Sequence, residues 1–480
     1  MIAMDPTSQP HLDQPVHSIH LMGICGTGMG TLAAMLQEAG YHVRGSDQNV
    51  YPPMSTFLAS KGIHLIQGYR PDNLEPPPDL VVVGNVIRKD NPEAQAVLHR
   101  GLTYCSMPQA LGRFFLNSAQ TLVVAGTHGK TTTSALLTWM LTVAGLDPGS
   151  LVGGIMINFG QSHRLGHGPY FIVEGDEYDT AFFDKGPKFL HYQPWAVVLT
   201  SVEFDHADIF PNLEAVENAF RRLLAILPAE GLLVVNADDA GASRLSREAR
   251  CRIITYGLQN PAQFQATDAE YAMSATRFRV QGPKGFDVRF TSPLAGAHNL
   301  SNALGLIALA HELGVGVDSI QQALTTFKSV RRRQEVRGEP GGITVIDDFA
   351  HHPTAVRVTI EALRPFYGGR RLWAIFEPRT NSSRRKVFQE RYAGAFDAAD
   401  VILIKEPPDM ERIAPEERLS TRRLVEEIAA RGKEAHYFLD VEAMLRFILP
   451  QIRPRDVLLI MSNGSFDNLH ERLLKALESR

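Results

Sequence analysis

The sequence predicts an α/β protein of three domains, and three observations support this. The chain has 480 residues, which is too long for a single hydrophobic core. Short apolar runs typical of buried strands alternate with helical segments along the chain, as in parallel sheets. Two of these runs lead into glycine-rich loops followed by helices, at Gly23–Gly30 and Gly126–Thr133. In such sheets ligands bind where the strands end, so we expect functional residues directly after strands.

The predicted domains cover residues 17–118, 119–328 and 329–480. In the first we expect a helix at Thr31–Ala39 and strands at Ser18–Met22, Tyr41–Ser46 and Leu80–Val83. In the second we expect a β-rich stretch at 252–293, helices at Ser134–Ala144 and Asn299–Leu313, and strands at Thr121–Ala125, Tyr170–Val173, Ala196–Thr200 and Leu232–Asn236. The third has predicted strands at Ile343–Ile346, Leu372–Phe376, Val401–Ile404 and Val457–Met461.

The composition argues against several classes of protein. Charges of both signs are interleaved and the net charge is −4, so no basic block indicates nucleic-acid binding. Three widely spaced cysteines, Cys25, Cys105 and Cys251, argue against a disulfide framework and for a reducing compartment. No apolar run reaches membrane-spanning length, and the first 17 residues, which we expect to form a flexible extension, lack the apolar core of a signal peptide. We expect a cytoplasmic protein with no membrane contact, and no feature indicates an obligate protein partner.

The strongest local signal is the loop Gly126–Thr133, which reads Gly-Thr-His-Gly-Lys-Thr-Thr-Thr. A strand, a glycine-rich turn with Lys and Thr, and a helix form a phosphate-binding loop. Its backbone N–H groups and Lys130 attract an anion, and the Thr131 hydroxyl can reach Mg²⁺. Val124 stands where the longer form of this loop has its first glycine, so the loop is a short variant. The alternative is a strand-to-helix turn without a ligand.

Acidic residues follow two of the neighbouring strands. Glu174 ends one apolar run and precedes three more acids, and Glu203-Phe-Asp-His206 follows the next. Carboxylates at strand ends beside a phosphate loop are where a Mg²⁺ ligand belongs, although Glu174 could also lie in a solvated turn. His206 is either structural or a second metal ligand. Two Mg²⁺ ions would suit a carboxylate attacking a γ-phosphate, since both partners are anionic.

Three later clusters are candidates for the same site. Asn299 either caps the helix that it opens or contacts an adenine edge. Arg331–Arg333, at the second domain boundary, is either a solvated face or a source of a guanidinium for a phosphoryl group upon domain closure. Asp347–Pro353 holds two acids and two histidines after a strand, a density more typical of a site than of a surface turn.

The first glycine-rich turn is less specific. Its spacing departs from Gly-x-Gly-x-x-Gly, and Asp47 follows the second strand, where a ribose-binding acid would sit. A ligand containing a diphosphate is therefore expected, and a dinucleotide is one option.

Taken in order, these motifs resemble those of the Mur ligases, which make the peptide stem of peptidoglycan. The resemblance runs from about His17 to the C-terminus. It rests on Gly126–Thr132, Glu174, Asp205-His206, His298-Asn299 with Asn302, Arg332-Arg333, and Asp347–Pro353. Within the family, the chain resembles the branch that uses UDP-N-acetylmuramate, through Asn49–Thr56, Ile66–Tyr69 and Arg331–Glu339. Gln334 stands where an alanine-adding member typically has an aromatic residue, and Ser465 departs from the usual glycine of a final motif.

The resemblance implies roles for individual residues. The fold would combine a Rossmann-like UDP-binding domain, a central ATPase-type phosphate-loop domain and a C-terminal Rossmann-like domain that binds the amine substrate. Lys130, His206 and Arg333 would be catalytic, and Thr131, Glu174 and His206 would bind Mg²⁺. UDP-substrate binding would fall to Gly26, Thr27, Gly28, Met29 and Asp47. ATP would contact Gly126, Thr127, His128, Gly129, Lys130, Thr131, Thr132, His298, Asn299, Asn302, Arg333, Asp348 and His351.

Several members also carry a carbamylated lysine after the metal-binding histidine. Here Ala219–Leu223 contains no lysine, so none is expected.

The reaction implied by the resemblance is ATP-dependent. The carboxylate of UDP-N-acetylmuramate becomes an acyl phosphate, and the amine of the tripeptide L-alanyl-γ-D-glutamyl-meso-diaminopimelate attacks it, in peptidoglycan recycling. Three alternatives remain: ligation of free L-alanine, an NAD-dependent oxidoreductase suggested by the first glycine-rich turn, and a nucleotide-binding regulator or kinase without ligase chemistry.

Overall fold

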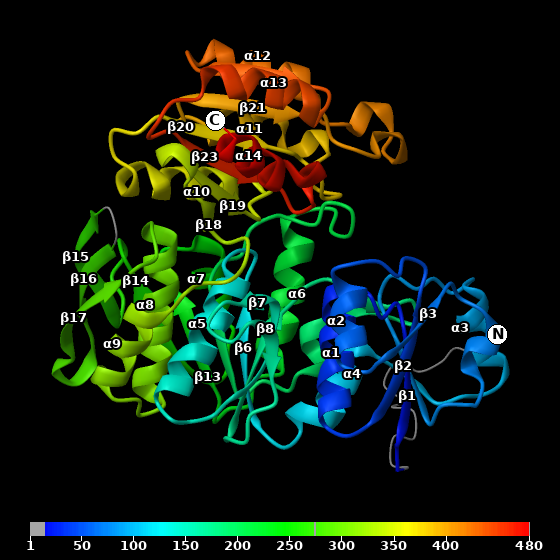
Figure 1. Ribbon diagram of the computed structural model, residues 1–480. Coiled ribbons are helices and arrows are strands. Elements are labelled where there is room, and N and C mark those ends of the chain that lie inside the picture. The colour runs from blue at the N-terminus through cyan, green and yellow to red at the C-terminus, as the bar shows by residue number, and fades with distance from the viewer. Residues whose placement is uncertain (1–14, 273–274, 480) are drawn as a thin grey trace.

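The computed structural model describes residues 15–272 and 275–479 (Figure 1). Three separate sheets, each mainly parallel, define three units that we call the first, middle and third domains. This confirms the predicted fold class; the domain boundaries at 118/119 and 328/329 stay predictions. Residues 1–14 of the predicted N-terminal extension lie outside the described residues.

The first domain contains a five-stranded parallel sheet in the order β3-β2-β1-β4-β5. Its strands are β1 (Ser18–Met22), β2 (His42–Asp47), β3 (His64–Gln67), β4 (Leu80–Val83) and β5 (Tyr104–Ser106). Its helices are α1 (Thr27–Glu38), α2 (Met54–Ser60), α3 (Pro92–His99) and α4 (Met107–Leu111). The predicted helix start at Thr31 was four residues late. The second half of the glycine-rich segment is helical. Glycine at position 30 lets α1 lie close to α2, since a Cβ there would come 2.6 Å from the Met54 sulfur.

The middle domain contains a ten-stranded sheet in the order β17-β16-β15-β14-β13-β12-β6-β9-β7-β8. Its strands are β6 (Gln120–Ala125), β7 (Gly149–Met156), β8 (Gln161–Arg164), β9 (Tyr170–Gly175), β12 (Ala196–Leu199), β13 (Leu232–Asn236), β14 (Arg252–Gly257), β15 (Phe264–Ala272), β16 (Ala275–Gln281) and β17 (Asp287–Ser292). A small hairpin pairs β10 (Asp179–Ala181) with β11 (Asp184–Pro187). The helices are α5 (Lys130–Val143), α6 (Leu213–Ala225), α7 (Ala240–Ser246), α8 (Ala297–Glu312) and α9 (Val317–Thr326).

The middle sheet is buried on both faces at its centre, because β6 and β12 carry almost only apolar residues. On one face α5, α8 and α9 pack against it, and on the other its core is continuous with that of the first domain. β6 lies between β12 and β9, so the loops after these three strands open at the same edge.

The third domain contains a six-stranded sheet in the order β18-β19-β23-β20-β21-β22, in which only the pairing of β18 with β19 is antiparallel. Its strands are β18 (Glu335–Gly338), β19 (Thr344–Asp348), β20 (Leu372–Phe376), β21 (Val401–Lys405), β22 (Glu434–Phe438) and β23 (Val457–Met461). Its helices are α10 (Pro353–Phe366), α11 (Gln389–Ala395), α12 (Thr421–Ala430), α13 (Val441–Gln451) and α14 (Leu469–Glu478). They form separate cores on the two faces of the sheet.

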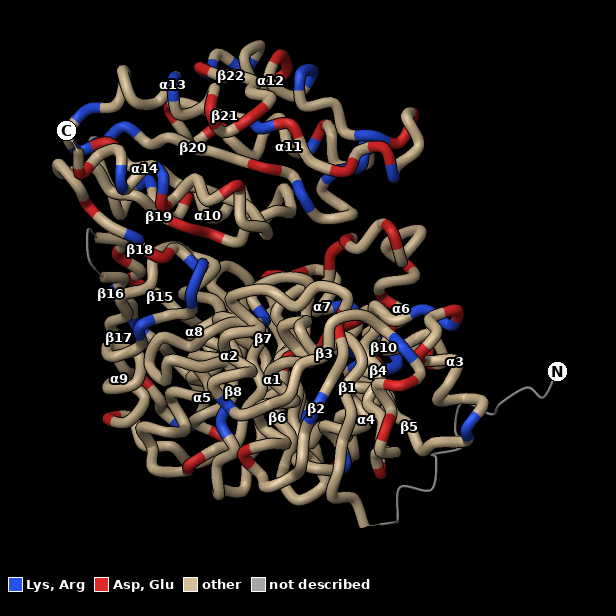
Figure 2. Tube along the Cα trace, turned by 45° about the vertical axis from the view of Figure 1, so that its right-hand side comes forward, with Lys and Arg blue, Asp and Glu red and all other residues tan. Residues whose placement is uncertain are grey.

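The third domain sits above the middle domain, so that α10 and β18–β19 face the edge that carries the phosphate loop (Figure 1). Lysine and arginine are interspersed with acidic residues along the trace (Figure 2). In the part of the chain that the structure describes, no helix is both long and apolar enough to cross a membrane.

Candidate active site

The predicted phosphate loop joins the end of β6 to the start of α5. Gly126 and Gly129 have φ values of +134° and +82°, a region that L side chains rarely adopt. A Cβ on Gly129 would lie only 2.9 Å from Asn302 Oδ1 on α8. The loop can therefore lie against α8 only with glycine at this position.

Lys130 is fixed at the first position of α5. Its Nζ donates hydrogen bonds to Gly126 O at 2.8 Å and to Glu177 Oε2 at 2.9 Å. Burial disfavours the ammonium form, but the carboxylates of Glu177, Asp176 and Glu174 outweigh it and raise the pKa of Lys130. The loop thus keeps a positive charge within a largely buried acidic surrounding.

Glu174 ends β9 beside the first turn of α5. Thr131 Oγ1 donates to Glu174 Oε2 at 3.0 Å, and the Gly153 backbone N donates to Oε1 at 2.5 Å. Burial, together with the charge of Asp176, raises the pKa of Glu174. A half-buried carboxylate beside a hydroxyl and a second acid is a set of hard oxygen ligands, and a divalent cation would offset its desolvation.

His206 faces the same acidic cluster from the loop that follows β12. Its Nε2 lies 3.7 Å from Glu177 Oε1, so Glu177 connects Lys130 with His206. The neighbouring Asp205 is buried; burial opposes its ionisation, but His206 and two further histidines lower its pKa to about 2. The backbone of His206 is left-handed, with φ +53°.

The first turn of α8 carries the predicted adenine contacts. Burial lowers the pKa of His298 to about 4, so the ring is neutral near pH 7. Asn299 Nδ2 donates to Ala295 O at 2.8 Å. α8 begins at Ala297 after Gly296, so Asn299 lies inside the helix and the capping alternative is wrong. Asn302, one turn further, contacts the phosphate loop.

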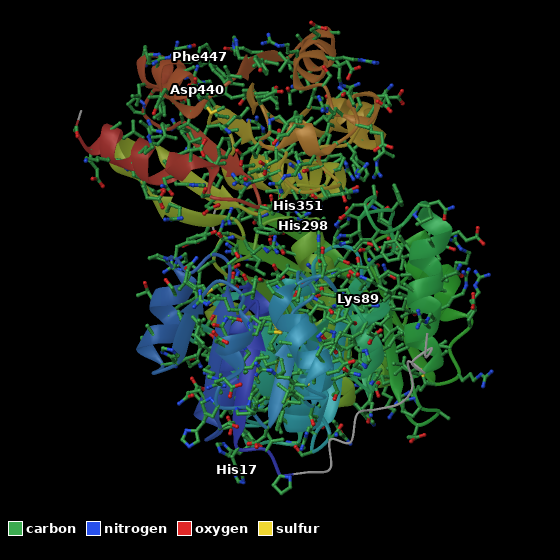
Figure 3. All side chains as sticks on the ribbon, turned by 90° about the vertical axis from the view of Figure 1, so that its right-hand side faces the viewer. His17, Lys89, His298, His351, Asp440 and Phe447 are labelled. Carbon is green, nitrogen blue, oxygen red and sulfur yellow. The ribbon has the colours of Figure 1, made fainter. Side chains whose placement is uncertain are left out.

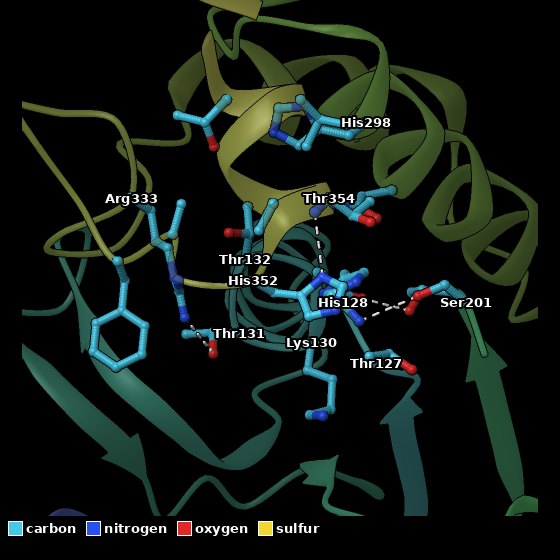
Figure 4. A pocket seen from close by; sticks show the side chains of 18 of the residues that line it. Thr127, His128, Lys130, Thr131, Thr132, Ser201, His298, Arg333, His352 and Thr354 are labelled. Atoms are coloured by element: carbon cyan, nitrogen blue, oxygen red, sulfur yellow. Dashed lines mark hydrogen bonds between the residues drawn. The ribbon is translucent and has the colours of Figure 1, made fainter. Parts of the chain in front are cut away.

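Arg333 reaches the phosphate loop from the segment that enters the third domain. Its Nη2 donates to Thr131 Oγ1 at 3.4 Å (Figure 4). Its guanidinium lies 4.7 Å from the Phe349 ring centroid. Asp348, at the end of β19, is held by the backbone N atoms of Gln334 and Ala350.

The neighbouring Arg332, the other arginine of the Arg332-Arg333 motif, turns away. Its Nη2 donates to the carbonyls of Ser462 and Gly464 at 2.6 and 2.7 Å. It therefore ties the segment to the third domain instead of facing the pocket.

These residues surround one pocket of about 400 Å³ between the middle and third domains. Figure 3 places His298 and His351 at this boundary, from opposite sides. The predicted residues that line it are Thr127, His128, Gly129, Lys130, Thr131, Thr132, His206, His298, Asn299, Asn302, Arg333, Asp348 and His351. Gly126 and Glu174 lie directly behind it, through their contacts with Lys130 and Thr131.

A second pocket, of about 340 Å³, adjoins the first and shares Asp205, His206 and His351 with it. From the third domain it is lined by residues that follow β20 and β23, namely Arg379, Thr380, Asn381, Ser382 and Asn463. Two cavities therefore meet at His206, one beside the phosphate loop and one beside the third sheet.

Sequence reasoning missed several residues of this site. Glu177, only 1% exposed, bridges Lys130 and His206. The acidic run after β9, to which Glu177 belongs, could have indicated this role. Among the described residues, His128, Glu203 and His352 also form a group that could hold a metal ion. An arginine, Arg391, already binds the Glu203 carboxylate and opposes a cation there.

The predicted UDP-binding residues lie apart from this pocket, in the first domain. Gly26 precedes α1, and Thr27, Gly28 and Met29 form the first turn of that helix. Asp47 ends the adjacent β2, where its Oδ2 accepts a hydrogen bond from the Cys25 backbone N at 2.9 Å. The helix N-terminus and the strand end form one edge of the first sheet, separate from the phosphate loop.

Comparison with known proteins identifies the class to which this fold and site belong. Three family models match successive parts of the chain: the Mur ligase family catalytic domain at residues 18–118, the Mur ligase middle domain at 124–310, and the Mur ligase glutamate ligase domain at 332–464. The chain belongs to the Mur ligase family and is an ATP-dependent ligase that forms amide bonds.

Individual relatives are similar over almost their whole length. UDP-N-acetylmuramate–L-alanyl-γ-D-glutamyl-meso-2,6-diaminoheptandioate ligase of Haemophilus influenzae is 42% identical, across 96% of this chain and 99% of that protein. The crystal structure of a murein peptide ligase from Psychrobacter arcticus superimposes with a TM-score of 0.73 at 34% identity, covering 97% of this chain and 99% of that one. UDP-N-acetylmuramate–L-alanine ligase of Geobacter sulfurreducens is 34% identical, across 96% and 98%.

Family membership decides against two of the alternatives considered from the sequence. The oxidoreductase and the regulator or kinase without ligase chemistry are both excluded, because the matched domains are those of ligases.

Proposed function

We propose that the protein joins the carboxylate of UDP-N-acetylmuramate to the free amine of L-alanyl-γ-D-glutamyl-meso-diaminopimelate with consumption of ATP, in peptidoglycan recycling. The observation that carries the proposal is the 42% identity, over nearly the full length of both chains, to the H. influenzae ligase that bears this name. The two adjoining pockets support it, because a ligase must hold a nucleotide and an amine on either side of one reacting carboxyl group.

In this proposal the first pocket holds ATP. The N–H groups of the loop 126–129 and the N-terminus of α5 face the phosphates, and the Lys130 ammonium adds positive charge. Arg333 approaches the same point from the third domain, where a γ-phosphate would lie beside Thr131. His298, Asn299 and Asn302 lie further along the pocket and contact the adenine; Asp348 and His351 close it from above.

Thr131, Glu174 and His206 are the residues that would hold Mg²⁺, and we propose two ions, one near Thr131 and Glu174 and one near His206. The half-buried Glu174 carboxylate and the acids around it fit such cations. When bound, Mg²⁺ neutralises the negative charge of the phosphate oxygens, which lets an anionic carboxylate approach them.

The chemistry proceeds in two steps. A carboxylate oxygen of the muramyl group forms a bond to the γ-phosphorus, and the bond to the β–γ bridging oxygen breaks, so that ADP leaves with its electron pair. The amine nitrogen then bonds to the acyl carbon, phosphate leaves, and the amine loses a proton. Lys130 and Arg333 stabilise the charge of the transferring phosphoryl group, and the domains position the reactants.

The two substrates reach this point from different domains. Gly26, Thr27, Gly28, Met29 and Asp47 take the UDP moiety at the edge of the first sheet. The second pocket, with Arg379 and Asn381, takes the amine substrate, whose carboxylates match a guanidinium.

A competition assay tests the proposal. The purified chain is given ATP, Mg²⁺ and UDP-N-acetylmuramate with tripeptide or with L-alanine, each at low concentration, and ADP release and the UDP-linked product are measured. We expect kcat/KM at least about 100-fold higher for the tripeptide, because the additional carboxylates each add contacts. If the protein ligates alanine efficiently and does not use the tripeptide, its activity is instead the one for which the G. sulfurreducens relative is named, UDP-N-acetylmuramate–L-alanine ligation.

A further inference from the structure

One carboxylate connects the phosphate loop to two helices of the third domain. Glu203 lies in the loop after β12, and its Oε2 accepts a hydrogen bond from His128 Nε2 at 2.8 Å. Its Oε1 accepts from Thr354 Oγ1 on α10 at 2.9 Å and from Arg391 Nη2 on α11. Arg391 Nη2 also donates to Thr354 Oγ1 at 3.0 Å, so the three side chains form a closed set of contacts.

The backbone of Glu203 is attached to the same loop. Glu203 N donates to Thr127 Oγ1 at 2.9 Å, and Thr127 Oγ1 donates to Glu203 O at 3.1 Å. Thr127 and His128 are consecutive residues of the phosphate loop. The position of Glu203 is therefore coupled to the loop through backbone and side chain. Among the described residues, its second carboxylate oxygen, Oε1, accepts hydrogen bonds from the third domain alone.

His352, next to α10, strengthens the same junction. Its Nε2 lies 3.2 Å from Phe204 O, and its ring centroid is 4.8 Å from that of His128. The contacts of His352 and those of Glu203 both join the middle domain to the third domain across the first pocket. Of the two sets, the contacts of Glu203 include a charged pair, with Arg391. The contact can form only when the third domain lies over the middle domain, since Thr354 and Arg391 belong to one side and His128 to the other.

We propose that Glu203 is a positioning residue that transmits closure of the third domain to the phosphate loop. When Arg391 and Thr354 meet its carboxylate, His128 and Thr127 are held in the arrangement seen here, and Arg333, Asp348 and His351 reach the ATP pocket from the same domain. The proposal rests on the ligase function above. In that function Glu203 touches no reacting atom, so replacing Glu203 should lower turnover more than substrate affinity.

The test is a double-mutant cycle on the full chain with Glu203→Gln and Arg391→Gln. Ligation kinetics are measured for all four proteins, and small-angle X-ray scattering records compaction upon adding UDP-N-acetylmuramate and a non-hydrolysable ATP analogue. We expect each single variant to lose about 10-fold to 100-fold in kcat with little change in the KM for UDP-N-acetylmuramate. The loss of kcat in the double variant should be no larger than that in the less active of the two single variants. All three variants should compact less than the parent protein.

Two further variants make the result specific. Arg391→Lys should recover part of the lost turnover, because an ammonium can still reach the carboxylate. Arg357→Gln is the matched control, since Arg357 also lies on α10 but its ion pair within the described part of the chain is with Glu361 of the same helix, at 3.0 Å. It should leave turnover and compaction unchanged.

Losses that simply multiply in the double variant, or unchanged turnover and compaction in Glu203→Gln, would overturn the proposal. If Glu203→Gln fails to fold, Arg391→Gln and Arg391→Lys decide, because Arg391 is 42% exposed at the surface of a short helix. Compaction with the nucleotide analogue does not depend on which amine is used. If the tripeptide assay fails, that result counts against the proposed function. The scattering measurements on the four proteins then still test whether Glu203 couples domain closure to the phosphate loop.

Discussion

At the scale of single residues, the candidate site depends on how charges are paired. Lys130 is surrounded by acids and held by Glu177, whereas Arg333 stacks on Phe349 and reaches the loop from another domain. One cation is therefore held beside the loop by the middle domain itself, and the second comes from the segment that enters the third domain.

Replacing Lys130 with alanine should reduce kcat/KM for ligation by about 100-fold to 1,000-fold, the usual cost of removing one preorganised charge from a transferring group. Steady-state ligation with the tripeptide measures this. Binding of UDP-N-acetylmuramate, followed by calorimetry, should be unchanged. Lys185→Ala is the matched control, because Lys185 is exposed and pairs with Asp179 in the small hairpin. Full ligation by Lys130→Ala would contradict the assigned role of the loop.

At the scale of elements, the phosphate loop is shaped by the helix on either side of it. α5 starts at the end of the loop, and α8 presses Asn302 against Gly129. The same helix α5 ends at another left-handed glycine, Gly145, where an added Cβ would meet no described atom within 4 Å. The two ends of one helix thus offer an internal comparison.

Gly129→Ala should weaken binding of an ATP analogue by at least about 10-fold and lower the free energy of unfolding by about 1–3 kcal/mol, since it adds both backbone strain and a clash with Asn302. Gly145→Ala has a similar φ, +76°, but no clash, so it should lose only about 1 kcal/mol and keep its nucleotide affinity. Calorimetric binding and thermal unfolding measure both. Equal nucleotide affinities in the two variants would show that the contact with α8 is unimportant.

At the scale of the whole molecule, the functional groups lie on three sheets. The residues proposed to bind UDP belong to the first sheet, the phosphate loop and the residues proposed to bind Mg²⁺ to the middle sheet, and Asp348 and His351 to the third. Binding of the UDP substrate should therefore be separable from metal binding, whereas ligation needs all three domains together.

Removing Mg²⁺ with a chelator should abolish ligation but change the Kd for UDP-N-acetylmuramate by less than about threefold. Glu174, Thr131 and His206 all lie in the middle domain, away from Asp47 and the start of α1. Isothermal titration with and without chelator measures the affinity, and added Mg²⁺ should restore turnover. Ligation that survives the chelator would remove the metal from the proposed mechanism.

Much of the fold could be predicted because its central strands are short and mainly apolar, and several end directly before a glycine or an acid, as at Gly23, Gly84 and Glu377. Ser18–Met22, Leu80–Val83, Leu232–Asn236, Leu372–Phe376 and Val457–Met461 were placed to the residue. Helix starts were less accurate, by four residues for both α1 and α5. Their first turns carry glycine or threonine, whose weak helix preference conceals a helix begun at a ligand-binding loop.

The sequence by itself determined the three-domain α/β class, the phosphate loop and the acids and histidine that follow its neighbouring strands, because residue type and order along a strand are local properties. The tertiary structure decided which of these residues meet. It separated Arg333 from Arg332, placed Glu177 between Lys130 and His206, and brought Arg391 to Glu203 across 188 positions of chain. Such contacts depend on how two sheets pack against each other, and no local pattern in the chain encodes that distance.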